Sequence, residues 1–436
     1  MKSFRIIIAL VLGSAGAFAE NWSQWRGPNF NGSSPETGLP DHFSKTENVL
    51  WRAPLPGPSG ATPIIFGDMI FVSSIDTANK AHVAMSFDRK DGHVRWNNNI
   101  GPGDSQDGNS NFASPSPVTD GQLVWFLYGN GDLFCFDTEG KKVWSRNLQK
   151  DYGAFAYQWT YGASPLLFKD KLYIQVLQRN EPVHGRGIPN GQSYLLALEP
   201  KTGKQLWKVA RPSDAVAESL EAYSTPIPFT HGERTELLIT GGDCITGSDP
   251  DTGKELWRWG TWNPQKIGHW RLVPSPTAGA GVALACGPKG APVIAVKLGK
   301  NGKLDDSAIA WKSTQPDVTS DVPTPLFHNG KFFILNGTKR KLLCVEPSNG
   351  NVIWWGEFDT RAVFESSPTA AGDNIYMMDH VGNVFVVSAT LDHFKLLGAA
   401  SMGDEGDNRL RSSIAISQSQ LFIRTGKSLY CIGKKN

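Results

Sequence analysis

The sequence predicts an all-β fold: an eight-bladed β-propeller of four-stranded antiparallel blades, whose last blade is closed by the N-terminal strand. Three observations predict it. A pattern ending in Trp recurs roughly every 43 to 63 residues. Each repeat begins with a second recurring pattern, a small residue followed by Pro and an apolar strand. The composition is rich in turn-forming and aromatic residues, with 46 Gly, 28 Pro and 11% aromatics, and no stretch shows sustained helical periodicity.

The Trp pattern is that of a two-stranded hairpin. An acidic residue, a short gap and a Gly precede each Trp, as in residues 136–144, 198–207, 249–257 and 345–354. The Gly supplies the positive φ of the turn, and the Trp falls on the outgoing strand. We interpret these Trp side chains as packing between neighbouring blades; a sugar-binding ladder would require exposed rings. They are Trp51, Trp96, Trp144, Trp207, Trp257, Trp311 and Trp354.

The second landmark is a small residue, then Pro, then an apolar strand. It begins near residues 61, 116, 163, 224, 274, 323 and 366, and an eighth copy at 412 lacks the Pro. A turn and a second apolar strand follow each copy, so two strands precede the hairpin and two form it. Four strands per repeat are typical of a propeller blade.

The two ends of the chain are expected to share one blade. The last repeat ends without a fourth strand. Residues 49–55, which include Trp51, have the pattern of a fourth strand, but no three strands of the same blade precede them. We therefore expect residues 49–55 to complete blade eight within a single domain, 49–436, and remove its open edge. The alternative is seven blades with frayed ends. In blade seven, Leu396 or Leu397 is expected to replace Trp.

The first residues resemble a secretory signal. Lys2 and Arg5 precede an apolar run at 6–12, and Ala17 and Ala19 supply an A-x-A site. We expect 1–19 to be a signal peptide cleaved after Ala19, 20–48 to be an extended segment, and the protein to be periplasmic or secreted with no transmembrane segment after cleavage. The nearly equal 43 basic and 41 acidic residues argue against a nucleic-acid partner.

The five Cys are an odd number, so at least one thiol is expected to be free or to pair between chains. Cys135, Cys344 and Cys431 occupy equivalent strand positions and are expected to be core residues. A disulfide between Cys244 and Cys286 stays open. No spacing suggests a metal site, including that of His184 and His269.

An acidic residue, a TGK-like turn and a closing Trp together resemble the tryptophan-docking motif of the pyrroloquinoline quinone (PQQ) repeat family, over residues 49–433. The resemblance implies the eight-bladed fold and two functional branches. One comprises quinoprotein alcohol and sugar dehydrogenases. The other comprises cofactor-free scaffolds, typified by the propeller lipoprotein of the outer-membrane β-barrel assembly machinery. The dehydrogenases carry adjacent Cys in a vicinal disulfide, which this sequence lacks.

Function is expected on the loops that do not repeat. The loops entering strand one, and those between strands two and three, lie on one face of a propeller. They carry aromatic residues that could stack on a planar or sugar ring of a ligand, and charged residues that could bind its polar edge. Alternating charges around the mouth of a propeller are, however, often only a network of salt bridges. The ligand-binding candidates are Trp159, Tyr161, Glu221, Tyr223, Trp270, Arg271, Asp321, Glu365, Arg409 and Arg411.

The sequence thus predicts an exported, monomeric, non-catalytic scaffold that binds a protein partner, small molecule or glycan, with envelope or outer-membrane assembly as its setting. No cofactor, metal or catalytic residue is expected. One alternative is a PQQ- and Ca²⁺-dependent dehydrogenase with Glu221, Asp321 or Glu365 as base. Another is a carbohydrate-binding propeller of the cell envelope.

Overall fold

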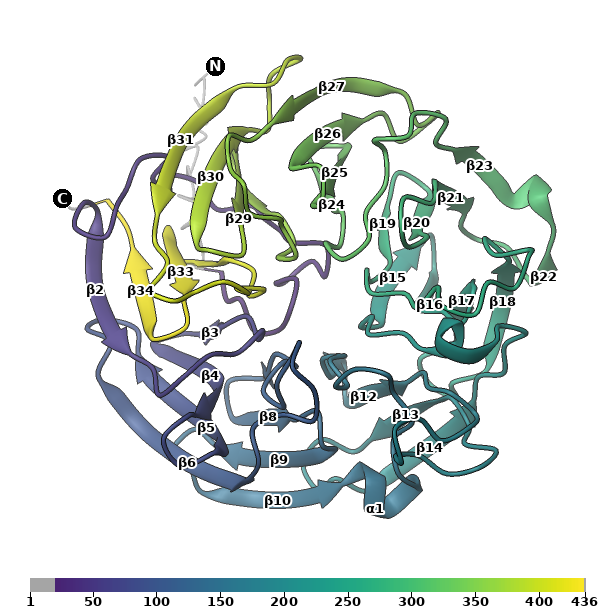
Figure 1. Cartoon of the computed structure of the whole chain (residues 1–436), viewed down its shortest axis with the longest axis horizontal. Coiled ribbons are helices and arrows are strands. Elements are labelled where there is room, and N and C mark those ends of the chain that lie inside the picture. The colour runs from purple at the N-terminus through teal and green to yellow at the C-terminus, as the bar shows by residue number, and fades with distance from the viewer. Residues whose placement is uncertain (1–19, 435–436) are drawn as a thin grey trace, which may run out of the picture.

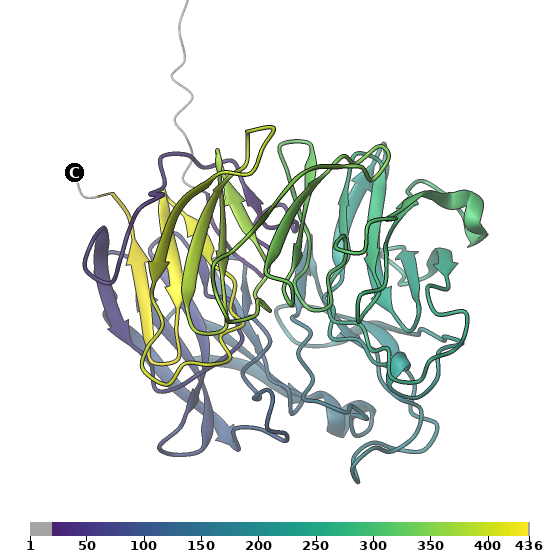
Figure 2. The ribbon, with the colours of Figure 1, turned by 45° about the horizontal axis from the view of Figure 1, so that its top comes forward.

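Eight four-stranded blades form a closed ring around a central axis (Figure 1) in the computed structural model, which describes residues 20–434. The predicted all-β fold and blade count are confirmed, and the seven-bladed alternative is wrong. The predicted signal peptide, 1–19, lies outside the described residues. Figure 2 shows the blades standing side by side, each twisted like a propeller vane.

The strands follow the chain from the axis outward in every blade except the last. Blade 1 contains β3 (Ile64–Phe66), β4 (Met69–Asp76), β5 (Ala81–Asp88) and β6 (Val94–Pro102); blade 2 contains β7 (Val118–Thr119), β8 (Leu123–Leu127), β9 (Asp132–Asp137) and β10 (Lys142–Asn147). Blade 3 contains β11 (Leu166–Phe168), β12 (Lys171–Val176), β13 (Tyr194–Leu198) and β14 (Gln205–Ala210); blade 4 contains β15 (Ile227–His231), β16 (Arg234–Gly241), β17 (Cys244–Ser248) and β18 (Glu255–Gly260). Blade 5 contains β19 (Thr277–Gly279), β20 (Val282–Cys286), β21 (Val293–Lys297) and β23 (Ile309–Lys312); blade 6 contains β24 (Leu326–His328), β25 (Lys331–Asn336), β26 (Lys341–Val345) and β27 (Val352–Glu357). Blade 7 contains β28 (Thr369–Ala371), β29 (Asn374–Met378), β30 (Asn383–Ser388) and β31 (Leu396–Ser401); blade 8 contains β32 (Ala415–Ser417), β33 (Gln420–Arg424), β34 (Ser428–Ile432) and β2 (Val49–Pro54).

A few short elements lie outside this pattern. Strand β1 (Ser33–Ser34) pairs parallel with β28, and β22 (Gly302–Leu304) pairs parallel with β18 on the outer edge of blade 4. The helices are α1 (Leu148–Tyr152) and the 3-10 turns η1 (Ala217–Leu220) and η2 (Asp306–Ala308). No helix within residues 20–434 has the length and apolar character needed to cross a membrane.

Blade 8 is completed by the N-terminal strand, as predicted. Strand β2 pairs antiparallel with β34, with Trp51 opposite Cys431 and Pro54 opposite Ser428. The ring is therefore held shut by hydrogen bonds and packing between the two ends of the chain, and blade 8 has no missing outer strand.

The repeated Trp side chains pack between blades, as predicted. Trp51 donates a 2.7 Å hydrogen bond from Nε1 to the Arg89 carbonyl in the next blade, and its ring lies against the hairpin residue Gly92. A Cβ at Gly92 would be 2.4 Å from this ring, and the glycine has a φ of 75°. At this junction and at four others, the hairpin glycine thus serves both the turn and the Trp of the preceding blade. The same contact joins Trp96, Trp144, Trp207 and Trp311 to Gly140, Gly203, Gly253 and Gly350.

Blade 7 departs from the expectation that Leu396 or Leu397 replaces Trp. The pairing of the third and fourth strands shifts register near the hairpin in each blade. In blade 6 the fourth-strand residue paired just before this shift is Trp354, opposite Cys344, whereas in blade 7 it is Gly398, opposite Val386. A Cβ on Gly398 would lie 2.1 Å from the Asp41 carbonyl, so the N-terminal segment occupies the space that Trp fills elsewhere. Leu39 and Phe43 of that segment are buried in the adjoining core. The expectation was wrong because the replacement comes from a distant part of the chain.

Residues 20–48, which we call the leader, lie against the face that carries the turns between first and second strands. The Trp22 carbonyl accepts from Ile65 N in blade 1, the Ser23 carbonyl accepts from Thr119 N in blade 2, and the Gly32 carbonyl accepts from Ala370 N in blade 7. In Figure 1 the purple leader reaches the middle of the ring. The leader therefore crosses one end of the axial channel.

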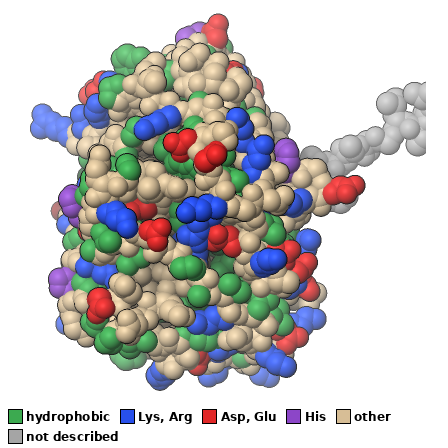
Figure 3. Space-filling model, turned by 90° about the vertical axis from the view of Figure 1, so that its right-hand side faces the viewer, with side chains coloured by type: hydrophobic (Ala, Val, Ile, Leu, Met, Phe, Trp, Pro, Cys, Tyr) green, Lys and Arg blue, Asp and Glu red, His purple; other side chains and the backbone are tan. Residues whose placement is uncertain are grey.

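All five Cys are free and buried, which confirms the core interpretation of Cys135, Cys344 and Cys431 and leaves Cys244 and Cys286 unbonded to each other. On the side of the ring seen in Figure 3, acidic and basic side chains are interspersed. That face therefore carries no single-sign patch of the kind that binds nucleic acid.

Candidate functional site

Each blade contributes one hydroxyl residue next to the axis, and seven of these eight residues line the axial cavity. Each is the small residue of the second landmark, held extended by the Pro that follows it in seven of the eight blades. Its backbone N–H donates to the hydroxyl oxygen of its counterpart in the next blade, at 2.8–3.2 Å, and the eighth bond returns to the first blade. We call this closed cycle the hydroxyl ring: Thr62, Ser116, Ser164, Thr225, Ser275, Thr324, Ser367 and Ser413.

A second ring of eight lies two residues earlier in every blade. Alternate residues of an extended chain point the same way, so these positions also face the axis. They do not repeat in chemistry. We call this set the rim ring, and all eight line the same cavity: Gly60, Ser114, Gly162, Tyr223, Val273, Val322, Glu365 and Arg411.

The leader turns the channel into a cup. Trp25 lines the cavity from the closed end, and the Arg26 guanidinium lies 5.8 Å from the centre of the Trp25 ring. Arg26 is 1% exposed and donates to the carbonyls of Pro368, Asn31 and Pro325, with no carboxylate among these acceptors. Burial lowers the pKa of Arg26 to about 9. The resulting axial cup has a volume of about 390 Å³, within the range of small-ligand sites.

One side of the cup is charged and internally paired. Arg411 Nε lies 2.5 Å from Glu365 Oε2, and His380 Nε2 lies 3.1 Å from the same oxygen. Burial alone would raise the pKa of Glu365, but the hydrogen bond to His380 and the charge of Arg411 outweigh it and lower that pKa to about 2. Glu365 is therefore a stable carboxylate and a weak base.

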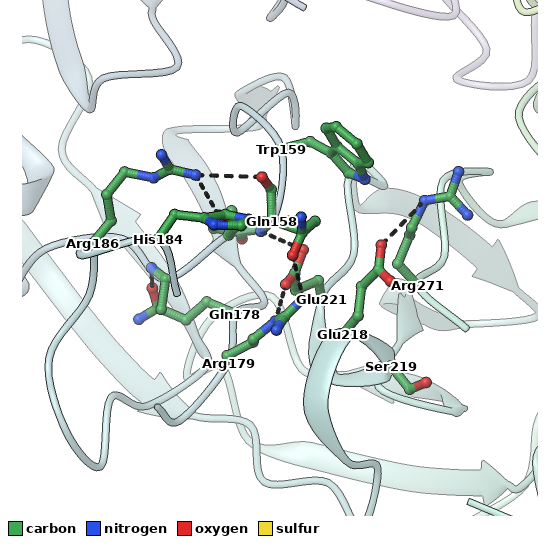
Figure 4. Close-up of polar contacts among 12 residues, drawn as sticks. Gln158, Trp159, Gln178, Arg179, His184, Arg186, Glu218, Ser219, Glu221 and Arg271 are labelled. Atoms are coloured by element: carbon green, nitrogen blue, oxygen red, sulfur yellow. Dashed lines mark hydrogen bonds and ion pairs between the residues drawn. The ribbon is translucent and has the colours of Figure 1, made fainter. Parts of the chain in front are cut away.

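The opposite side of the cup holds Trp159 and Arg271, which Figure 4 draws with their supporting network. Tyr223 Oη accepts from Trp159 N at 3.2 Å and donates to Glu221 Oε2 at 2.7 Å. Glu221 is fully buried and also accepts from Gln158 N and from Arg179 Nε. Burial raises the pKa of Glu221 and outweighs these hydrogen bonds. Glu221 thus positions the loop that carries Trp159.

Arg271 has no close ion pair, unlike Arg411, which pairs with Glu365. Its closest carboxylate is Glu218, at 3.7 Å from Nε, and its guanidinium donates no hydrogen bond within residues 20–434. Its terminal nitrogens are therefore available to a ligand.

The structure brings five predicted candidates together at the cup: Trp159, Tyr223, Arg271, Glu365 and Arg411. The other five do not line it. Tyr161 is buried and donates to the Gln175 carbonyl, Glu221 lies behind Tyr223, and Trp270 packs against a hydrophobic core. Asp321 accepts from Lys289 N. Arg409 does not line the cup itself; it donates to the Gly108 carbonyl and to Asn109, which does line it.

Sequence reasoning missed Trp25 and the small rim residues Gly60, Ser114 and Gly162. The rim positions could have been found by counting two residues back from each Ser or Thr of the second landmark. Trp25 carried no such signal, because the leader has no repeat.

The cup does not fit the quinone alternative. PQQ is a tricarboxylate held beside Ca²⁺, and its dehydrogenases need a free carboxylate as base. Among the described residues the cup is lined by one carboxylate, Glu365, which Arg411 and His380 already engage. A base is most effective with a pKa near the working pH, far above that of Glu365. Glu221 and Asp321 lie outside the cup.

Comparison with known proteins agrees with the fold. The family model described as outer membrane protein assembly factor BamB matches residues 43–177 and 188–390. No curated protein matches. The structure is similar to BamB from Moraxella catarrhalis, with a TM-score of 0.60, 13% identity and coverage of 88% of this chain and 97% of that one.

Two quinoproteins are also similar in fold. A europium-containing methanol dehydrogenase has a TM-score of 0.65 and 11% identity, over 94% of this chain and 90% of that one. The quinohemoprotein alcohol dehydrogenase from Comamonas testosteroni has a TM-score of 0.61 and 14% identity, over 95% and 81%. These likenesses concern the fold alone, whereas the family match covers most of the sequence. The chain belongs to the family of outer membrane protein assembly factor BamB.

Proposed function

We propose that this protein is an exported, monomeric, non-catalytic scaffold that binds a partner of the cell envelope through the face on which the cup opens, in the assembly of outer-membrane proteins. Membership of the BamB family supports the setting. One observation carries the scaffold assignment: the carboxylates near the cup are committed to ion pairs and hydrogen bonds, whereas loops of this face expose apolar side chains such as Ile188 and Val216.

The experiment is a pull-down of the tagged protein from cell envelopes, with three single variants. Ile188→Asp and Val216→Asp place a charge on the cup face, and we expect each to lose the partner. Leu206→Asp places the same charge on β14, at the outer circumference, and should retain it because Leu206 is comparably exposed there. Loss in all three variants, or in none, contradicts the assignment of the partner to this face. Mass spectrometry of the exported protein should give Glu20 as its first residue.

The dehydrogenase alternative keeps one supporting observation, the similarity in fold to the two quinoproteins. Its test is incubation with PQQ and Ca²⁺. Saturable quinone binding, with reduction of a dye by an alcohol or sugar, would contradict the scaffold assignment.

The carbohydrate-binding alternative is supported by Trp159 at the cup. It requires a glycan-array signal that Trp159→Ala removes. Trp270→Ala is not informative, because Trp270 packs against the core and its loss would act through folding.

A further inference from the structure

Glu20, the first residue of the predicted mature chain, lies at the junction between blades 8 and 1. Its carbonyl accepts from Ser417 Oγ, on β32 of blade 8, at 2.7 Å. The next side chain, Asn21 Oδ1, accepts at 2.8 Å from Gly67 N, in the turn that follows β3 of blade 1. The beginning of the leader is therefore held by both blades.

The Glu36 carboxylate is held beside Glu20 by a turn of blade 8. It accepts from Gln418 N at 2.7 Å and from Ser419 N at 2.5 Å, and these two residues form the turn between β32 and β33. Both have a positive φ, of 55° and 57°, as the two central residues of a type I′ turn do. Successive N–H groups of such a turn bind an anion, so blade 8 fixes the position of this carboxylate.

The same carboxylate also accepts from the Glu20 nitrogen, which lies 3.1 Å from Glu36 Oε1. The Glu20 side chain accepts from Ser34 Oγ at 3.0 Å. The donors to the two carboxylates are thus backbone N–H groups and one hydroxyl, with no Lys, Arg or His among them within residues 20–434. Burial, together with the charge of Glu36, raises the pKa of Glu20. Two half-buried acidic groups therefore lie close together without a cation.

We propose that Glu36 binds the α-ammonium group that signal cleavage after Ala19 creates on Glu20, and that this ion pair holds the leader on the junction between blades 8 and 1. Hydrolysis of the Ala19–Glu20 peptide bond consumes one water, leaves a carboxylate on Ala19 and leaves an ammonium on Glu20. The nitrogen beside Glu36 changes from a neutral amide with one N–H into a cation with three. That cation compensates both acidic side chains and forms a charge-assisted hydrogen bond with Glu36.

This inference rests on the proposed export of the protein, and it adds a structural role for the new N-terminus. Cleavage would then do more than release the chain from its signal peptide. It would supply the one charge that the junction between blades 8 and 1 lacks, so the leader would be held most firmly only after processing.

The test compares two purified chains at pH 7 by scanning calorimetry. One is released from a removable fusion so that it begins at Glu20. The other carries Gly-Ser-Gly-Ser before Glu20, which moves the ammonium away but keeps the Glu20 N–H. The chain that begins at Glu20 should have a Tm higher by about 1–2 °C, because a charge-assisted hydrogen bond replaces a neutral one.

Glu36→Gln is then introduced into both chains, and the difference in Tm between them should vanish. Glu47→Gln is the matched control, because Glu47 is an exposed carboxylate of the same leader. With that substitution the difference between the two chains should persist. Any loss of support for the blade 8 turn lowers the Tm of both Glu36→Gln chains alike, so it cancels in this comparison.

A second measurement follows the proton on the α-amino group. Acetic anhydride acylates the neutral amine, and mass spectrometry gives the rate at Glu20 relative to the exposed Lys254. A paired ammonium gives up its proton less readily, so Glu36→Gln should accelerate acylation of the chain that begins at Glu20 by about fivefold to tenfold. Glu47→Gln should change the rate by less than about twofold.

Three results would overturn the proposal. They are equal Tm values for the two unsubstituted chains, a Tm difference between the chains that survives Glu36→Gln, and an acylation rate that Glu36→Gln leaves unchanged. Both chains come from fusions, so these results do not depend on where the cell cleaves the signal. Mass spectrometry of the exported protein tests the cleavage, and the envelope pull-down tests the partner, so failure of each is distinguishable.

Discussion

Replacing Trp51 by Ala should destabilise the blade in which the two ends of the chain meet. The Trp51 side chain is 8% exposed, packs on Gly92 and Phe422, and donates to the Arg89 carbonyl. Removing a buried Trp costs about 3–5 kcal/mol. Unfolding entropy near 60 °C is about 2.1 cal/mol/K per residue, so for roughly 400 residues a loss of about 4 kcal/mol lowers Tm by about 4–5 °C.

The assay is differential scanning fluorimetry of Trp51→Ala beside Trp355→Ala. Trp355 lies on β27 and is 55% exposed, so its removal should lower Tm by about 1 °C or less. Comparing the two variants therefore distinguishes the effect on Tm of losing the closing contact from the effect of removing a Trp side chain as such. Equal shifts in the two variants, or an unchanged Tm for Trp51→Ala, would refute the assignment of Trp51 to closure.

Three further outcomes are expected. Burial raises the pKa of Asp243 from 3.8 to about 6, so the folded state loses stability as pH rises from about 4 to 6. Asp243→Asn should therefore raise Tm by about 3 °C at pH 7.5, and the gain should vanish toward pH 4 in a pH series of melting curves. Ser164→Ala leaves the buried Ser116 N–H without its acceptor and should cost about 1–3 kcal/mol in chemical denaturation, whereas Ser164→Thr should be nearly silent because it keeps the hydroxyl. The five thiols are buried, so a thiol reagent should label almost none in the native protein and all five in denaturant; rapid labelling of the native protein contradicts this.

The repeats made the ring predictable. Each blade carries its own strands, hairpin glycine and Trp within about 50 residues, so local pattern and turn chemistry pointed to the same structure. Closure by β2 followed from counting, because one strand was missing at the C-terminus and one was spare at the N-terminus.

The leader and the cup could not be predicted in the same way. The contacts of Arg26 and Asp41 are to blades far away in the sequence, and nothing in the leader repeats. Gly398 shows the consequence: its blade lacks Trp because a segment more than 300 residues earlier fills the space. The site candidates were chosen by residue type and loop, which does not distinguish Arg271, facing the axis, from Tyr161, facing the core.

The hydroxyl ring has a consequence for how such a protein changes in number of blades. Each repeat brings one N–H donor and one hydroxyl acceptor to the axis, so the cycle stays complete when a whole repeat is duplicated or deleted. A repeat inserted by gene duplication would find a partner on both sides without any new residue. The axial hydrogen bonds therefore do not by themselves set the number of blades at eight.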